Sequence, residues 1–369
     1  MLGAIQFGVL AACIVLFVPM GMAGWHLSRN KMLFFSGALF ITLAVCVHLT
    51  PYFPSVTDLV ASVSSVVVYD NRNYCINLVN DIVWEVKPRS DVELVNMNVS
   101  KLDYYEKRWD WAKSRKVGAC GFQKLDKSDA SDLLNGSWVV VAGDSQARFV
   151  ALSLLNLVLD SDSGRMNSIR SDLFKRHSDY NIVIGEIGMK LDFIWAPYEM
   201  NLTDMVMSFN QRRKYPDVLM MGAGLWHMLH VTNATDYGFH LKNLRSSVES
   251  LLPFSPELGA DGPVTGSVSI RSPHLFWIGM PMLINGMLNT EEKKEKMNDE
   301  VWHVYDRALG ASKLLRQTGG PLVLLDIQSF TWNCGPRCTD DGMHYDKVVY
   351  EAAIHIMLNA LLIESHQTL

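Results

Sequence analysis

Two long stretches without charged residues stand at the start of the chain and constrain its fold more than any other feature. Met1–Trp25 carries no charged side chain, and Met32–Thr57 contains no Asp, Glu, Lys or Arg. Each stretch can supply the roughly 20 apolar residues with which a helix crosses a bilayer. The segment between them, residues 26–31, contains Arg and Lys, and positive loops stay in the cytosol. We therefore expect a two-helix transmembrane hairpin over residues 1–53.

Two other interpretations of the first stretch stay open. It resembles a signal peptide cleaved after Ala23, although it lacks the positive charge that usually precedes the apolar core of such a peptide. The two stretches can also be buried helices of a soluble protein, although uncharged runs of this length are uncommon there. With the hairpin, residues 54–73 form a stem and residues 74–369 form a domain in the lumen or outside the cell.

Glycosylation sequons and cysteines are consistent with a lumenal domain. The sequons are at Asn98, Asn135, Asn201 and Asn233. The cysteines beyond the apolar stretches are Cys75, Cys120, Cys334 and Cys338. An even number in an oxidising compartment suggests two disulfides, with three possible pairings. We favour Cys75–Cys120 and Cys334–Cys338, and four reduced, buried thiols are the alternative.

The rest of the chain alternates short apolar runs with stretches of helical periodicity. Strands are expected near residues 138–143, 180–187, 191–197, 217–224, 273–281 and 320–327. Helices are expected over 145–160, 237–253, a charged stretch ending near 315, and 346–365. Strands without internal charge, separated by helices, indicate a parallel sheet covered on both faces. The fold class is therefore α/β with a doubly wound parallel sheet, and the Gly-, Ser- and Pro-rich segment 255–273 is a surface insertion.

The charge balance argues against a nucleic-acid partner. The formal net charge is −5, and the charged run at 291–296 mixes both signs, as a solvated helix face does. The 369 residues suffice for one large domain or two small ones.

The sequence Gly143-Asp144-Ser145 ends the first expected strand of this domain. Ligands bind at the carboxyl ends of the strands in a doubly wound sheet. A serine that opens a helix there exposes its hydroxyl beside backbone N–H groups, which suit a developing oxyanion. Serine needs a positioned base to act as a nucleophile, so Ser145 alone is equally well explained as a helix cap.

A base and its partner stand near the C-terminus, in the loop before the last expected helix. Asp341 and His344 are three residues apart, which lets the carboxylate reach the imidazole ring while the other ring nitrogen faces Ser145. Asp340 is adjacent and competes for the same role. Together these residues predict a serine nucleophile, a histidine base and an orienting aspartate.

The combination resembles the SGNH/GDSL hydrolase superfamily. The resemblance rests on two motifs: Gly143-Asp144-Ser145, with Arg148 three residues on, and Asp341-Gly342-Met343-His344. Supporting stretches at 193–197, 217–229 and 287–309 are similar to the PC-esterase branch. That branch includes the trichome-birefringence-like polysaccharide O-acetyltransferases and the lumenal domain of sialic acid O-acetyltransferases. The resemblance covers about residues 135 to 365.

The resemblance implies a role for each of these residues. Ser145 is the nucleophile, His344 the general base and acid, and Asp341 the residue that orients His344. The oxyanion is held by the backbone N–H of Ser145 and by a glycine of the segment that contains Gly222 and Gly224. Gly222 stands where the wider superfamily has an asparagine, and losing one oxyanion donor costs about 3 kcal/mol of transition-state stabilisation.

Two further residues are candidates for substrate binding. Arg148 can steady the loop, contact substrate or stay on the helix surface, and Trp226 can stack on a sugar ring or join the core. His227 and His230 are spaced for one face of a helix, but no third ligand stands near them, so no metal is expected. No bound cofactor is expected, because no phosphate-binding glycine loop is present.

The function expected from the resemblance is O-acetylation of a glycan or polysaccharide in the Golgi or another secretory membrane. The acetyl donor, derived from acetyl-CoA, would reach the lumen through another membrane protein. An acetyl esterase with the same triad is the first alternative, since only the acceptor differs. The second alternative is a catalytically silent, membrane-tethered binding protein. It is suggested by Gly222, which stands where the wider superfamily has its oxyanion asparagine.

Overall fold

The computed structural model describes residues 74–89, 101–159, 163–251 and 273–365. The chain divides into two compact units, Met1–Asn71 and Arg72–Leu369, and every described residue belongs to the second. The expected membrane hairpin (1–53), the stem (54–73) and nearly all of the insertion at 255–273 lie outside the described residues. Among the described helices, none combines the length and the apolar character that crossing a membrane requires.

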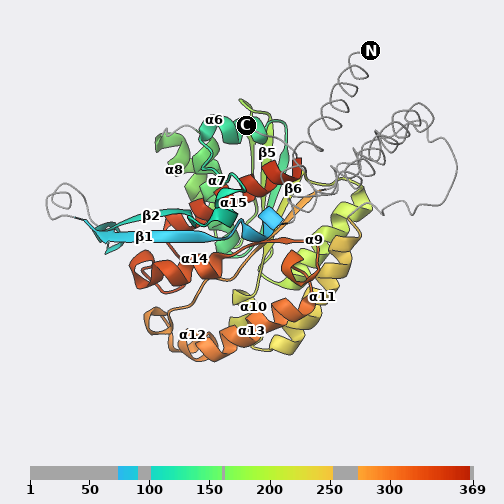
Figure 1. Cartoon of the computed structure of the whole chain (residues 1–369). Coiled ribbons are helices and arrows are strands. Elements are labelled where there is room, and N and C mark those ends of the chain that lie inside the picture. The colour runs from blue at the N-terminus through green and yellow to red at the C-terminus, as the bar shows by residue number, and fades with distance from the viewer. Residues whose placement is uncertain (1–73, 90–100, 160–162, 252–272, 366–369) are drawn as a thin grey trace, which may run out of the picture. The chain divides into compact units, whose positions relative to one another are not determined.

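A six-stranded, mostly parallel sheet forms the centre of the second unit (Figure 1). Its strands are β3 (Trp138–Gly143), β4 (Tyr180–Ile184), β5 (Met189–Trp195), β6 (Val218–Gly222), β7 (His274–Ile278) and β8 (Val323–Leu325). They lie in the order β4-β5-β3-β6-β7-β8, and every neighbouring pair except β4–β5 is parallel. The fold is therefore mixed α/β with a parallel-rich sheet.

The edge strand β4 departs from the expected all-parallel sheet. The connection from β4 to β5 contains only residues 185–188, with Gly188 at φ 61°. A crossover between parallel strands needs about a dozen residues, so this short turn makes an antiparallel hairpin. β4 is also half-exposed, with Val183 at 64 % relative accessibility, as an edge strand can be.

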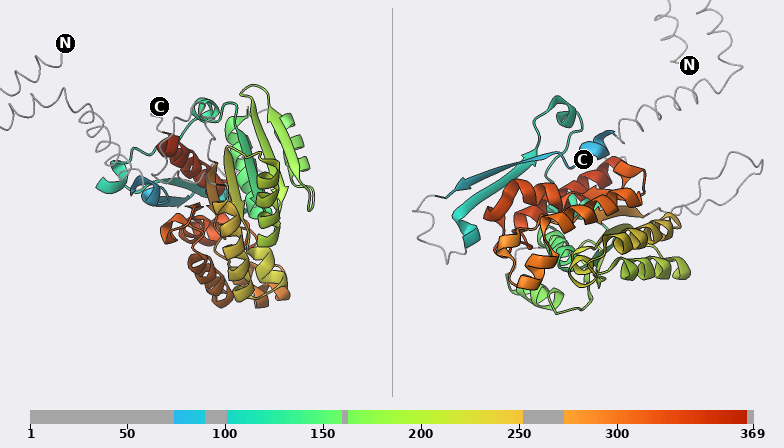
Figure 2. Two further views of the ribbon diagram at one scale, coloured as in Figure 1. Left: turned by 90° about the vertical axis from the view of Figure 1, so that its right-hand side faces the viewer. Right: turned by 90° about the horizontal axis from the view of Figure 1, so that it is seen from below.

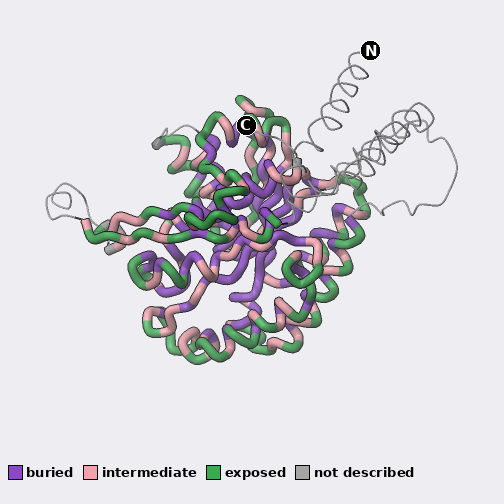
Figure 3. Tube along the Cα trace, in the orientation of Figure 1, coloured by how far each residue is buried: buried purple, intermediate pink, exposed green. Residues whose placement is uncertain are grey.

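Alternate residues of each strand pack on opposite faces of the sheet. In β3, Val139 and Val141 enter one hydrophobic cluster, and Val140 and Ala142 enter the other. All four are fully buried, and burying one valine contributes about 1.5–3 kcal/mol. This two-sided burial explains why the strand sequence is continuously apolar, and Figure 3 shows the buried positions along the strands.

Helices cover both faces of the sheet (Figure 2). The first cluster, which contains Val139 and Val141, also includes residues of five helices. These are α6 (Lys127–Leu133), α7 (Ser145–Val158), α8 (Ser163–Leu173), α14 (Ile327–Cys334) and α15 (Lys347–Ser365). The second is built with α9 (Glu199–Arg212), α10 (Leu225–His230), α11 (Ala234–Glu249) and α13 (Asp299–Ser312), beside α12 (Glu291–Lys296). Short elements complete the unit: α5 (Arg115–Gly118), η1 (Lys101–Tyr104), η2 (Asn285–Met287), η3 (Arg316–Thr318) and η4 (Gly335–Cys338).

The charged helix expected up to residue 315 is two helices, α12 and α13. Asn298 separates them because its side chain caps α13 and accepts a hydrogen bond of 3.0 Å from the N–H of Val301. Met297, the residue before the cap, is buried, so the chain turns inward at this point.

The strand order changes direction at β3. The chain leaves β3 through α7 and reaches β5 on one side, then passes through α9 to β6 on the other side. α7 and α9 pack in different clusters, on opposite faces of the sheet. Such a switch point opens a crevice at the carboxyl end of the strand. Ser145, the first residue of α7, therefore lies where this class of fold binds ligands.

A two-stranded antiparallel sheet was not expected from the sequence. β1 (Ile82–Pro88) pairs with β2 (Tyr105–Trp111), and this ribbon contacts α14 and α15 before its far end projects from the domain (Figures 1 and 2). β2 reads YEKRWDW, and its charges hide the alternation of an amphipathic strand. Trp109 and Trp111 are buried and anchor the ribbon.

Both favoured disulfides are present. Cys75 pairs with Cys120, and Cys334 pairs with Cys338. The first links the helical residues at 74–78 to the turn after α5, and the second closes the end of α14 onto η4.

Candidate active site

The sequence Gly143-Asp144-Ser145 joins β3 to α7 in a tight turn. Gly143 has φ 153°, and a Cβ there would collide with the carbonyl oxygen of Gly222, so only glycine fits. Asp144 caps α7 by accepting a hydrogen bond of 2.9 Å from the N–H of Gln146. Burial raises the pKa of Asp144 to about 6 despite this hydrogen bond. Each residue of the motif thus helps to place Ser145 at the first helical position.

The structure brings Ser145, His344 and Asp341 into one hydrogen-bonded chain. The Ser145 Oγ lies 2.8 Å from His344 Nε2, and His344 Nδ1 lies 2.6 Å from Asp341 Oδ2. A carboxylate only accepts hydrogen bonds, so Nδ1 carries the ring proton and Nε2 is free to accept from the serine hydroxyl. This arrangement suits proton transfer from a serine nucleophile to a histidine base.

Asp341, not the neighbouring Asp340, is the residue that contacts the ring. Its Oδ1 accepts hydrogen bonds from the backbone N–H groups of Met343 (2.9 Å) and His344 (2.7 Å). Burial would raise the pKa of Asp341, but the hydrogen bonds from the ring and backbone of His344 outweigh it and hold the pKa below its ordinary value. Asp341 therefore stays ionised and fixes the ring.

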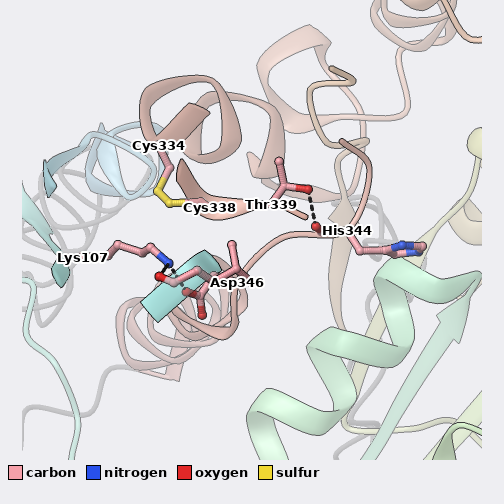
Figure 4. The surroundings of a disulfide bond; sticks show 7 residues. Lys107, Cys334, Cys338, Thr339, His344 and Asp346 are labelled. Atoms are coloured by element: carbon pink, nitrogen blue, oxygen red, sulfur yellow. Dashed lines mark hydrogen bonds and ion pairs between the residues drawn. A yellow bond between two sulfur atoms is a disulfide. The ribbon is translucent and has the colours of Figure 1, made fainter. Parts of the chain in front are cut away.

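Short-range contacts close the loop that carries the histidine (Figure 4). The Thr339 hydroxyl donates to the carbonyl oxygen of His344 at 2.7 Å and accepts from the N–H of Gly342 at 2.9 Å. Thr339 also forms a β-bridge with Tyr345. The Cys334–Cys338 disulfide immediately precedes this loop, and the His344 ring points away from it towards α7.

An ion pair fixes the far side of the same loop to the β1–β2 ribbon (Figure 4). Lys107 Nζ lies 2.5 Å from Asp346 Oδ2, and the Lys107 side chain is only 4 % exposed. The backbone N–H of Asp346 donates to the carbonyl oxygen of Cys338 at 2.8 Å. The ribbon therefore contributes to the position of His344, which sequence reasoning did not anticipate.

Gln146 is a second residue that sequence reasoning missed. Its side-chain Nε2 donates to the carbonyl oxygen of Met343 at 3.0 Å, and its Oε1 accepts from the Tyr350 hydroxyl at 2.8 Å. Gln146, the residue after the serine, is thus hydrogen-bonded directly to Met343, the residue before the histidine. Its place next to Ser145 was the only available signal, because both partners are about 200 residues away.

The expected oxyanion glycines lie beside the serine segment. β3 and β6 pair with Gly143 opposite Gly222, so both strands end at the same edge of the sheet. Gly222 and Gly224 are buried, and a Cβ on Gly222 would lie 2.8 Å from both the Cβ and the carbonyl oxygen of Ile278. The site therefore has no room for an asparagine at position 222 unless Ile278 moves. Oxyanion binding by the N–H groups of Ser145 and of Gly222 or Gly224 stays a prediction.

Arg148 and Trp226 lie in a cluster of rings next to the serine segment. Arg148 is 6 % exposed, and its guanidinium lies 4.7 Å from the ring centre of Trp195. Trp195 contacts Trp226 edge-to-face, and His177 stacks on Trp195 at 5.1 Å. Neither Arg148 nor Trp226 lines the cavity at Ser145, so their expected contact with substrate stays a prediction.

Glu199 is a buried acid that the sequence did not single out. It is fully buried at the start of α9, and neither carboxyl oxygen has a hydrogen-bond partner within the described structure. Burial raises its pKa to about 8, so the group is mainly neutral at pH 7.

The other expected sites can be placed more briefly. His227 bonds to Tyr305 and Asp236, whereas His230 is exposed. Within the described ranges no group of three or more His, Cys, Asp or Glu residues is arranged to hold a metal. The sequon residues Asn135, Asn201 and Asn233 are exposed, and Asn98 lies outside the described residues.

Comparison with known proteins identifies a close relative along the whole chain. No protein-family model matches. The chain is 74% identical over 371 residues to Protein ALTERED XYLOGLUCAN 9 of Arabidopsis thaliana, and the match covers 100% of both sequences. This relationship is consistent with the PC-esterase resemblance of the serine and histidine motifs. The chain belongs to the ALTERED XYLOGLUCAN 9 family.

Proposed function

We propose that this chain is a membrane-anchored serine O-acetyltransferase that acts on xyloglucan-type polysaccharides in the Golgi lumen. The observation that carries the proposal is the hydrogen-bonded chain from Ser145 through His344 to Asp341. The name of the Arabidopsis relative, ALTERED XYLOGLUCAN 9, supports the substrate class. As part of the same proposal we assign the domain to the SGNH-like, three-layer fold.

The first half of the reaction acetylates the serine. His344 Nε2 accepts the Ser145 hydroxyl proton as Oγ attacks the carbonyl carbon of the acetyl donor. The bond between the acetyl carbon and the donor's leaving group then breaks, and that group takes the proton from His344. The products are acetyl-Ser145 and the protonated leaving group, with the ionised Asp341 stabilising the intermediate imidazolium.

The second half transfers the acetyl group to the polysaccharide. A sugar hydroxyl gives its proton to His344 and attacks the acetyl carbon of acetyl-Ser145. The Ser145 Oγ–acetyl bond breaks, and His344 returns the proton to Oγ. Water in place of the sugar would give acetate, which is why the same residues can also serve an esterase.

Backbone N–H groups are proposed to hold the oxyanion in both halves. The N–H of Ser145 lies in the first turn of α7, where helical N–H groups have no partner within the helix. Gly224, the residue that precedes α10, is the proposed second donor. With no asparagine at position 222, these backbone groups replace the side-chain donor of the wider superfamily.

The proposed cellular setting rests on the first part of the chain. Its two uncharged apolar stretches fit a membrane hairpin, and the sequons and disulfides fit an oxidising lumen. The acetyl donor, derived from acetyl-CoA, would be supplied across the membrane by another protein.

Product analysis with the full-length protein tests the proposal. The protein is incubated with an acetyl donor and an unacetylated xyloglucan oligosaccharide, and the products are separated and weighed by mass spectrometry. The proposal predicts an acetylated oligosaccharide that disappears with Ser145→Ala. Free acetate without an acetylated sugar would make the protein an esterase, and transfer that survives Ser145→Ala would contradict the proposed nucleophile.

A further inference from the structure

A cavity of about 700 Å³ opens directly on the Ser145–His344 pair. Phe149 and Phe174 form part of its apolar wall, and Leu102 of η1 reaches it from the ribbon side. Phe149 lies against the His344 ring, with 5.5 Å between the ring centres. A substrate that reaches the serine can therefore lie between α7 and its neighbours, away from the cluster that contains Trp226.

A second cavity, of about 570 Å³, continues from the first. The two share the lining residues Leu152, Asn156, Arg170 and Lys347, so they adjoin along α7. Arg170 comes from α8 and Lys347 is the first residue of α15. We call the two cavities together the α7 channel.

One face of α7 forms the floor of the α7 channel. Ser145, Phe149, Leu152 and Asn156 are spaced by four, three and four residues, which places them on one side of a helix. With a rise of 1.5 Å per residue, the channel runs about 16 Å from Ser145 to Asn156. This length suits a chain of several sugar rings with one hydroxyl at the serine.

The chemistry of the lining favours an uncharged polyol. Asn156, Asn167 and Ser153 offer donors and acceptors on the same side chains, as sugar hydroxyls require. Charges of both signs are present, with Arg170 and Lys347 accompanied by Asp340 in the first cavity and Glu351 in the second. A polyanionic carrier would meet these carboxylates at a cost, whereas a neutral glycan can hydrogen-bond to either sign.

The ring cluster on the other side of the serine segment is less suited to stacking on a sugar. Arg148 lies 4.7 Å from the Trp195 ring centre, and His177 stacks on the same ring, so protein groups already cover it. Trp226 is in turn surrounded by His177, Trp195 and Tyr198 at ring distances of 5.1 to 6.3 Å.

We infer that the α7 channel is the binding site for the neutral polysaccharide acceptor, held at Asn156 and Arg170 with its reacting hydroxyl at Ser145. The inference rests on the proposed function for the choice of acceptor. The inference adds where the acceptor binds and which residues hold it, neither of which follows from the triad.

Binding to a protein without its nucleophile tests the inference separately from catalysis. The parent is full-length Ser145→Ala, and the probe is an unacetylated xyloglucan oligosaccharide titrated by calorimetry. Asn156→Trp fills the exposed junction of the two cavities, and Arg170→Ala removes a charged donor. Each is expected to raise the dissociation constant about tenfold or more, Asn156→Trp by blocking the junction and Arg170→Ala by the loss typical of one hydrogen bond to a charged group.

Matched controls lie on the opposite layer of the domain. Gln211→Trp on α9 and Arg307→Ala on α13 change exposed residues of the same kinds and should leave the dissociation constant within about twofold. Unchanged affinity in Asn156→Trp and Arg170→Ala, or no binding by the parent, overturns the inference. Coenzyme A that binds the parent and is lost in the same two variants, with glycan affinity unchanged, would assign the channel to an anionic donor instead.

Acetylation of the wild-type protein, measured beside this titration, keeps the two proposals apart. Glycan binding that the channel variants weaken, together with a wild-type protein that never forms acetyl-Ser145, would leave this inference standing and reject the transferase. Acetyl-Ser145 with unaltered glycan affinity in both channel variants would do the reverse.

Discussion

The two halves of the candidate triad are held in different ways. Ser145 is placed by its own neighbours in sequence, because Gly143 makes the turn and Asp144 caps the helix. The histidine loop has local contacts through Thr339 and Asp341, but it also depends on distant groups, namely Lys107 of the ribbon and Gln146 of α7. The difference teaches that a nucleophile at a strand end can be recognised locally, whereas the alignment of its base is a property of the whole domain.

The largest expected effect tests which aspartate serves the histidine loop. Asp341→Asn should lower kcat about 10⁴-fold, because an amide can donate to Nδ1 and favour the wrong ring tautomer. Asp340→Asn should change kcat less than about tenfold, since Asp340 does not contact the ring. Transfer rates of the two full-length variants with one donor and acceptor make the comparison. Equal losses would mean that the ring is not oriented as the structure has it.

A smaller effect is expected from cutting the loop off from the ribbon. Lys107→Met leaves Asp346 largely buried without its partner and should lower the free energy of unfolding by about 3 kcal/mol. Arg108→Met is the matched control, because its pair with Glu106 is exposed and contributes less than about 1 kcal/mol. Denaturant unfolding of both variants measures the difference. An unchanged free energy of unfolding in Lys107→Met would show that the ribbon does not support the histidine loop.

The serine side can be disturbed through Gly222. Gly222→Ala should lower the free energy of unfolding by about 1–3 kcal/mol, because its Cβ would meet Ile278. Gly118→Ala is the control, since a Cβ there meets nothing within 4 Å. Thermal unfolding checks the pair. If Gly222→Ala and Gly222→Asn were tolerated, the absence of an oxyanion asparagine would have no steric explanation.

The smallest effect is expected from the hydrogen bonds that Gln146 makes between the two halves. Gln146→Leu removes the hydrogen bonds to Met343 and Tyr350 while keeping a similar volume in the core. Losing about 1 kcal/mol of the interactions that align the serine with the histidine should lower kcat roughly five- to tenfold. Steady-state kinetics with a fixed acceptor measures it. An unchanged kcat would indicate that the serine and the histidine are positioned independently.

Local pattern made much of the fold and site predictable. The apolar run before Gly143 and the spacing of Asp341 and His344 were readable because neighbours in sequence determine them. The disulfide pairs were also anticipated. The β1–β2 ribbon, the antiparallel β4, Lys107 and Gln146 were not, because each depends on partners far along the chain. The assignment of Ser145 as a nucleophile that forms an acetyl-serine intermediate stays a prediction.

Intact-mass spectrometry of the full-length protein after exposure to an activated acetyl ester tests the central claim most directly. The account predicts one added acetyl group, mapped to Ser145 by peptide analysis, in the wild-type protein and none in Ser145→Ala. His344→Ala should also lack the adduct, because the serine then has no base. An adduct that persists in Ser145→Ala, or a wild-type protein that neither gains an acetyl group nor turns over the ester, would contradict the account.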